Sequence, residues 1–418
     1  MYKFNQKQLK LGIVSNEFFD PSLGRMGGFG MAVRQVAECF QSNPGLNFEP
    51  VFIAAQLRES ESHPQKEIRV HNTRLLLRPR NRLEFIQRIR AEKLDVLLTM
   101  DYRIHYRPIF WMLPRTPIII WVHDPRTSYD TYRITSTRLP GEEAVPQGLK
   151  PVDCTSLAQV VRISRWTNRS VLFATPAMYL SEKILDTYGV KVPTEQVIFL
   201  PNMMEHILGS QSGEIQVQKS QRPTVVFLAR LDPYKRPWVF VELARYFPEV
   251  EFIMMGKPHF EGRGSWQPTD LPTNIKLMGH VDGEEKMKIL SSAWVLVNTS
   301  IHEGLAISFL EAFAHEIPVL SCVDPENVVS RYGIYVGRWE GTGMAAIPYF
   351  VDGLKRLLES PELRHRLGKA GREWVENTHN QRNFLRGFKQ LCDQAQVTNH
   401  QVQSTNGYEN CVSFRRIS

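Results

Sequence analysis

The chain has no hydrophobic run long enough to cross a membrane, and its cysteines show no pairing pattern. The longest apolar stretch lies around residues 117–122, far short of the about 20 residues that a membrane-spanning helix needs. The five cysteines are scattered, which excludes a CxxC metal or redox pair and a disulfide framework. The amino-terminal sequence MYKFNQKQLKLGIVS is too polar for a signal peptide. We therefore expect a cytoplasmic protein that does not span a bilayer.

The excess of positive over negative charge is confined to the first half of the chain. Residues 1–200 contain 27 Lys and Arg against 19 Asp and Glu, whereas the remainder contains 24 of each, so the first half has the whole net charge of +8. Much of the excess falls in residues 69–93. A solvated basic face would explain it, and so would attraction to an anionic acceptor or to anionic lipid. Nucleic acid is not an expected partner, because the segment has few aromatic rings to stack on bases.

Residues 82–93 within this basic segment have the pattern of an amphipathic helix. Leu83, Ile86 and Ile89 would share one side, with arginines largely around them. A basic amphipathic helix can make peripheral contact with an anionic membrane, although the same helix could simply cover a sheet.

Short apolar runs alternate with helical patterns along most of the chain. The first series is KLGIVS, PVFIAA, DVLLTM, PIIIWVH, SVLFAT and QVIFLPN, and the second is TVVFLAR, VEFIMMG, NIKLMGHV, VLVNTS and IPVLSCV. Continuous apolar runs are typical of parallel strands buried on both faces. Their alternation with helices predicts α/β architecture with doubly wound sheets.

A polar stretch separates the two series and predicts the domain organisation. We expect a Rossmann-like acceptor domain at 1–205, a linker at 206–223, a Rossmann-like nucleotide-sugar domain at 224–378, a helix at 379–395 packing back on the first domain, and a polar tail at 396–418. Ligands of such sheets bind at the carboxyl ends of the strands, so two facing domains would form a cleft. The loop at 125–156 is either an acceptor loop or lid, or a passive insertion.

The segment HEGLAISFLEAF, residues 302–313, is the most informative in the sequence. It predicts a loop that ends at Glu303 and Gly304, followed by a helix from Leu305. The amino end of a helix binds anions through free N–H groups and the helix dipole. Two turns further on, the Glu311 carboxylate can accept hydrogen bonds from two neighbouring hydroxyls. A phosphate site beside a diol site indicates a nucleotide.

Four motifs in a fixed order resemble glycosyltransferase family 4. They are GRMGGFG, WVHD, LARLDPYKRP and HEGLAISFLEA, and the resemblance covers about residues 10–380. It implies the GT-B fold, in which two Rossmann-like doubly wound domains face each other across a cleft. It also implies a retaining glycosyltransferase that moves a sugar from a nucleoside-diphosphate sugar to a hydroxyl acceptor.

The resemblance assigns roles to residues of the second half. Arg230 and Lys235 match the cations that neutralise the leaving diphosphate, so neither a metal nor a cofactor is expected. Glu311 matches the ribose ligand, and Glu303 lies near the transferred sugar, where either a charge-stabilising or a proton-transfer role fits. The backbone facing the sugar and diphosphate belongs to Gly304, Leu305, Ala306 and Ile307.

The first half is expected to complete the site. His123 matches a histidine that reaches the donor sugar, and Gly27 and Gly28 let the first loop pass close to a ligand. Asn202 matches a cleft-lining position. Arg25 and Asp124 are candidate acceptor contacts.

The sequence departs from the family at two places. Ala306 and Ser308 replace a glycine and a proline that are common in the loop reading the sugar, and Glu316 stands where a glycine usually ends the helix. The donor base (UDP, GDP or ADP), the sugar, the acceptor and the oligomeric state stay open. A nucleotide-sugar epimerase or phosphorylase, or a non-catalytic nucleotide-sugar-binding protein, are the alternatives to transfer.

Overall fold

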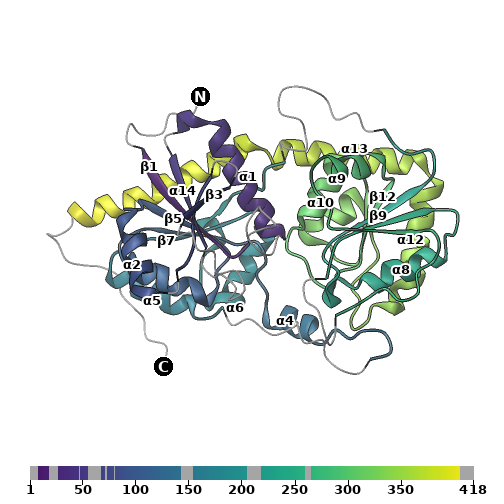
Figure 1. Ribbon diagram of the computed structural model, residues 1–418, viewed down its shortest axis with the longest axis horizontal. Coiled ribbons are helices and arrows are strands. Elements are labelled where there is room, and N and C mark those ends of the chain that lie inside the picture. Colours follow the sequence, from purple (N-terminus) through teal and green to yellow (C-terminus); the bar gives the residue numbers. More distant parts are fainter. Residues whose placement is uncertain are drawn as a thin grey trace.

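The computed structural model describes residues 8–17, 27–46, 48–54, 67–70, 73–79, 81–142, 154–204, 218–258 and 265–404. They form two α/β lobes that lie side by side (Figure 1). Two parallel sheets, one in each lobe, confirm the doubly wound α/β architecture predicted from the apolar runs.

The first sheet has eight strands in the order β3-β4-β2-β1-β5-β6-β7-β8. All neighbours are parallel except β3 and β4, which pair antiparallel at the edge. The sequence patterns missed this hairpin, whose four-residue strands EIRV and TRLL contain charged residues and no long apolar run. The strands are β1 (Leu9–Ser15), β2 (Phe48–Ala54), β3 (Glu67–Val70), β4 (Thr73–Leu76), β5 (Val96–Met100), β6 (Ile118–Trp121), β7 (Val171–Thr175) and β8 (Val197–Phe199).

The second sheet has six strands in the order β11-β10-β9-β12-β13-β14, all parallel. The last strand along the chain lies at one edge of this sheet. It does not coincide with an apolar run in the sequence, so it was not predicted. The strands are β9 (Thr224–Leu228), β10 (Glu251–Met255), β11 (Ile275–Gly279), β12 (Val295–Asn298), β13 (Val319–Ser321) and β14 (Gly333–Tyr335).

Helices cover both faces of each sheet. In the first lobe these are α1 (Gly28–Ser42), α2 (Arg82–Ala91), α3 (Arg107–Met112), α4 (Ser128–Thr135), α5 (Leu157–Trp166) and α6 (Ile184–Tyr188). In the second lobe they are α8 (Pro237–Arg245), α9 (Gly283–Ser292), α10 (Ile307–Ala314), α11 (Val328–Tyr332), α12 (Ile347–Glu359) and α13 (Pro361–Thr378), and α14 (Gln381–Ser404) follows. Short 3-10 turns are η2 (Pro44–Leu46), η4 (Ile104–Tyr106), η5 (Met178–Lys183), η6 (Thr194–Gln196), η7 (Pro233–Lys235), η8 (Pro325–Asn327) and η9 (Met344–Ala346). Within the described residues no helix combines the length and apolarity needed to cross a membrane.

Helix α14 returns to the first lobe. In Figure 1 it runs over that lobe, whereas α13 runs over the second. Its residues Phe384, Phe388 and Leu391 are buried in the same apolar cluster as α1 and one face of the first sheet. Helices α2, α3 and α5 cover the other face, where Phe85 and Ile89 of α2 are buried. The apolar side of α2 therefore covers the sheet, and only Leu83 of the predicted stripe is strongly exposed, at 69%.

The two lobes meet at the carboxyl edges of their sheets. A Cβ atom added to Gly304 would lie 2.0 Å from the carbonyl oxygen of His123, which follows β6 of the other lobe. One added to Gly28, at the start of α1, would lie 3.7 Å from Ile307 at the start of α10. The two helix amino ends thus lie close together across the boundary between the lobes.

Three buried histidines have imidazole groups held neutral by the fold. Burial lowers the pKa of His123 to about 3, that of His315 to about 4 and that of His379 to about 3. Burial acts in the opposite sense on a nearby carboxyl group, because it raises the pKa of Asp101 to about 6. The unfolded chain therefore binds more protons than the folded one below pH about 6.5, since three histidines outweigh one aspartate.

We expect the free energy of unfolding to fall between about pH 7 and pH 5, because each depressed histidine costs up to about 1.4 kcal/mol per pH unit below its unfolded pKa. Chemical denaturation at both pH values measures this slope. His379 packs between Trp374 and Phe199, so His379→Phe keeps an aromatic ring and removes one titrating group. The variant should show a shallower slope than the wild type. An equal slope would show that His379 does not contribute.

Candidate functional site

Glu303 is held by groups of its own lobe at the end of β12. Its Oε1 atom accepts hydrogen bonds from Lys235 Nζ at 2.6 Å, Ser300 Oγ at 2.6 Å and Asn298 Nδ2 at 3.1 Å. Burial alone would raise the pKa of Glu303, but the Lys235 charge and these hydrogen bonds hold it below its usual value. Glu303 is therefore an oriented carboxylate, paired with a cation that the sequence placed in a different motif.

Arg230 lies at the carboxyl end of β9 and faces the first lobe. Its guanidinium donates to the Tyr234 hydroxyl at 2.6 Å and lies 3.2 Å from Asp232 Oδ2. Across the boundary, its Nη1 atom lies 3.9 Å from Glu17 Oε1, and Glu17 also accepts a hydrogen bond from the Gly30 N–H of α1. Arg230 and Lys235 thus come together with Glu303 at the edge where the lobes meet.

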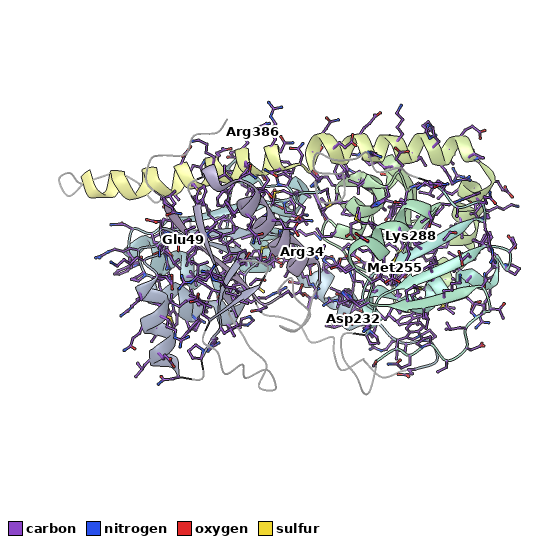
Figure 2. All side chains as sticks on the ribbon, turned by 45° about the horizontal axis from the view of Figure 1, so that its top comes forward. Arg34, Glu49, Asp232, Met255, Lys288 and Arg386 are labelled. Carbon is purple, nitrogen blue, oxygen red and sulfur yellow. The ribbon has the colours of Figure 1, made fainter. Side chains whose placement is uncertain are left out.

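Glu311 belongs to a chain of charges that crosses between the lobes. Its Oε1 accepts from Lys286 Nζ at 2.8 Å, and Lys286 lies 3.2 Å from Asp282 Oδ1. Asp282 in turn accepts from Arg34 of α1 at 2.9 Å. Figure 2 shows Arg34 on the side of the first lobe that meets the second. The side chains of Glu311 and Lys286 are both nearly buried, so the pair fixes the position of the carboxylate.

His123 contributes a buried ring with an unused nitrogen. Its ring lies edge-on to Trp121 at 4.4 Å and to Phe29 at 5.9 Å. Within the described residues, its buried Nε2 atom has no hydrogen-bond partner. An unsatisfied buried nitrogen at the lobe boundary is a ready partner for a ligand hydroxyl.

Asp101 fixes the loop that presents His123. It is fully buried at the end of β5 and has a φ of 53°, a left-handed conformation that non-glycine residues rarely adopt. Its carboxylate accepts from the backbone N–H groups of His123, at 2.7 Å, and Asp124, at 3.1 Å, and from the Tyr188 hydroxyl at 3.2 Å. No sequence motif pointed to Asp101.

His302 joins the lobes beside Glu303. Its Nε2 atom lies 2.9 Å from Asp124 Oδ1 and its Nδ1 atom 3.3 Å from Asp130 Oδ1, both in the first lobe. Asp124 also accepts from Arg126 at 2.7 Å. Although burial would raise the pKa of Asp124, Arg126 and His302 hold it well below its usual value. Asp124, which the sequence predicted as an acceptor contact, thus contacts His302 across the boundary between the lobes in this structure.

The segment 124–142 of the first lobe makes contacts with the second lobe. Arg133 donates to Glu340 at 2.7 Å, and Leu139 is buried in the core of the second lobe. The guanidinium of Arg126 lies 5.5 Å from the centre of the Tyr234 ring. The predicted 125–156 loop thus contains the helix α4 and reaches the Arg230–Lys235 region, whereas 143–153 lies outside the described residues.

The other residues predicted for the site are Gly27, Asn202, Arg25 and the backbone of residues 304–307. Gly27 caps α1, and a Cβ there would lie 2.7 Å from Glu17 Oε2. Asn202 is fully buried, and both polar atoms of its side chain have no partner within the described residues. Arg25 lies outside the described residues. The backbone of the 304–307 stretch leads into α10, which begins at residue 307.

The helix end keeps the left-handed backbone of a terminal glycine, although Glu316 is a residue type that rarely adopts it. Helix α10 ends at Ala314, and Glu316 adopts a left-handed φ of 56°. Arg372 of α13 lies 3.4 Å from the Glu316 carboxylate, and the backbone of Gly368 packs against the Glu316 carbonyl. Neighbouring α13 thus supports a conformation that glycine would adopt without strain.

Sequence reasoning missed several residues of this boundary: Glu17, Arg34, Asp101, Arg126, Asp282, Lys286 and His302. His302 is the first residue of the HEGLAISFLEA motif and Arg126 lies two residues after WVHD, so these positions were a usable signal. The other five had no such signal, because their contacts join segments far apart in the chain.

Residues 212–374 match the family model of glycosyl transferases group 1. Over 139 residues the chain is 27% identical to a GDP-mannose-dependent monoacylated alpha-(1-6)-phosphatidylinositol monomannoside mannosyltransferase of Corynebacterium glutamicum, an alignment that covers 31% of the chain and 35% of that protein. The chain spans about a third of the length of the curated relatives it matches.

Solved structures resemble the whole fold. A sucrose-phosphate synthase from Thermosynechococcus elongatus matches with a TM-score of 0.63 and 15% identity, covering 95% of this chain and 100% of that one. The Anabaena protein HepE, solved in complex with UDP-glucose, matches with a TM-score of 0.62 and 12% identity over the same shares of the two chains. The chain therefore has the GT-B fold, and its residues 212–374 match the model of glycosyl transferases group 1.

Proposed function

We propose that this protein is a retaining glycosyltransferase that moves a sugar from a nucleoside-diphosphate sugar to a hydroxyl acceptor. The observation that carries the proposal is the grouping of Arg230, Lys235, Glu303 and His123 where the carboxyl edges of the two sheets meet. In parallel α/β sheets this edge is where ligands bind. The match of residues 212–374 to the model of glycosyl transferases group 1 supports the same activity.

The donor would be held mainly by the second domain. Arg230 and Lys235 supply two positive charges for the diphosphate, and the amino end of α10 supplies backbone N–H groups beside Gly304. Glu311, oriented by Lys286, would accept hydrogen bonds from the two ribose hydroxyls. A UDP-, GDP- or ADP-sugar fits this chemistry, and HepE was solved with UDP-glucose.

Bond cleavage leaves positive charge on the sugar ring and negative charge on the departing phosphate. The two cations stabilise the phosphate charge, and this stabilisation needs no metal ion. Glu303 would face the positive sugar ring, while the free Nε2 of His123 would bond a sugar hydroxyl. In a front-side reaction the leaving phosphate oxygen takes the proton of the acceptor hydroxyl as the new glycosidic bond forms.

The two domains would have different roles, one in binding the acceptor and the other in binding the donor. We propose that residues 1–205 form the acceptor domain and 224–378 the donor domain, with Arg25 and Asp124 on the acceptor side. We propose the reducing cytoplasm as the location, because the five cysteines are scattered along the sequence without a disulfide pattern.

Replacing Lys235 should disable transfer. We expect Lys235→Met to lower kcat/KM at least about 100-fold, because one charge that stabilises the leaving phosphate is lost. Donor hydrolysis and transfer are measured with a panel of UDP-, GDP- and ADP-sugars and hydroxyl acceptors. Lys288→Met, which changes an exposed lysine of α9 (Figure 2), is the matched control and should behave as wild type.

Full activity of Lys235→Met would refute the site. Because the substitution leaves the buried Glu303 unpaired, the melting temperature of each variant is recorded, and Glu303→Gln in the same background restores a neutral pair. A product with an inverted sugar hydroxyl and no acceptor consumed would identify an epimerase. Donor binding without any turnover would identify a binding protein.

We expect Lys286 to affect the binding of a nucleoside diphosphate only by orienting Glu311. We expect Lys286→Met to weaken nucleoside diphosphate binding about tenfold, since Glu311 loses the cation that orients it. In a Glu311→Gln background the same change should cost little, because the two residues act as a unit. Calorimetric titration with UDP, GDP and ADP measures all four combinations. Losses that simply add would show that Lys286 acts on the ligand independently of Glu311.

A further inference from the structure

The outer surface of α2, α3 and α5 combines exposed aromatic and aliphatic side chains. Trp166 is 87% exposed, Leu83 69%, Trp111 49% and Ile163 41%. Single exposed apolar residues are ordinary, but two tryptophans on neighbouring helices are not explained by the packing of the lobe. We name this region the α2–α3–α5 surface.

Three hydrogen bonds show that these helices are neighbours. Arg90 of α2 donates to the Met112 carbonyl at the end of α3, at 3.3 Å. Arg107 of α3 donates to Gln159 of α5 at 3.1 Å. Beyond the end of α5, Arg169 donates to the Phe110 carbonyl of α3 at 2.6 Å. The carboxyl ends of all three helices therefore lie together, and Trp111 and Trp166 belong to that end.

Positive charge surrounds the tryptophans. No acidic residue occurs in 107–116 or in 157–169, which together contain five arginines. Four basic side chains near these helix ends, Lys93, Arg115, Arg162 and Arg165, are exposed. The helix dipole favours cations in a last turn, but it does not account for the exposed tryptophans among them.

We propose that the α2–α3–α5 surface docks on an anionic lipid bilayer. Tryptophan is suited to the headgroup level of a membrane, where its apolar ring and N–H group are both accommodated. Exposed lysine and arginine near the surface add attraction to anionic headgroups. A surface with both, and with no acidic residue on α3 or α5, has the charge and polarity of a membrane-binding face.

The docking surface lies away from the proposed donor site. The carboxyl ends of α2, α3 and α5 lead into the amino ends of β5, β6 and β7, whereas the site lies at the carboxyl edge of the same sheet. Figure 1 shows α2 and α5 on the side of the first lobe opposite α14 and away from the second lobe. Binding to a bilayer therefore leaves the boundary between the lobes uncovered, and docking is independent of catalysis.

Vesicle binding tests the proposal. The full chain is sedimented with phosphatidylcholine vesicles, with or without phosphatidylserine, at low and high salt. We expect binding to the anionic vesicles at low salt, weaker binding at high salt, and none to phosphatidylcholine alone. Arg162→Glu/Arg165→Glu should lower the partition coefficient about 30-fold or more, because each lost cation costs roughly fivefold. Trp166→Ala should lower it about tenfold.

A matched control distinguishes an effect of this surface on vesicle binding from an effect of the net charge of the protein. Arg366 and Lys369 are exposed on α13 at the same spacing of three residues, so Arg366→Glu/Lys369→Glu makes the same change of net charge on the other lobe. That control should bind vesicles as wild type, and all variants should keep wild-type donor hydrolysis. Equal binding by Arg162→Glu/Arg165→Glu, or no wild-type binding to anionic vesicles, would overturn the proposal. So would a dimer in solution that Trp166→Ala dissociates, because a second copy would then cover the surface.

Discussion

The contact of Gly304 with the His123 carbonyl is the constraint on which the rest of the site depends. Only a residue without a side chain allows the loop after β12 to approach the end of β6 so closely. That approach places Glu303 of one lobe beside His123 of the other and brings His302 to Asp124. The ion pairs at the boundary, from Arg34 with Asp282 to Arg230 with Glu17, surround this single close contact.

Charge compensation characterises the whole boundary. Lys235 pairs with Glu303 and Arg230 with Asp232, so the cations proposed to bind a diphosphate already have carboxylate partners. Lys286 pairs with Glu311 and Arg126 with Asp124 in the same way. Buried charges require such partners, because leaving one unpaired costs several kcal/mol. An incoming diphosphate would therefore compete with carboxylates for Lys235 and Arg230, and the protein need not leave bare positive charge exposed before the donor binds. Oriented ion pairs of this kind would keep the proposed donor site in place between reactions.

Different faces of the first lobe contact the second lobe, helix α14, and the helices α2, α3 and α5. The carboxyl edge of its sheet and the segment 124–142 meet the second lobe, and α14 covers one face with Phe384 and Phe388. The other face is covered by α2, α3 and α5, whose inner sides pack on the sheet and whose outer sides contain Trp111 and Trp166. Basic residues of the first half thus lie both at the lobe boundary, as Arg34 and Arg126 do, and on the outer surface.

Much of the architecture follows from the sequence itself. Continuous apolar runs specify buried parallel strands, and the ordered motifs at His123, Arg230 and Glu303 identify the family, because these signals are local in the chain. The short hairpin of β3 and β4 was missed, since its stability comes from pairing at a sheet edge. Only the tertiary structure decided that Lys286 orients Glu311 and that Asp101 holds the loop of His123, because these contacts join residues that folding alone brings together.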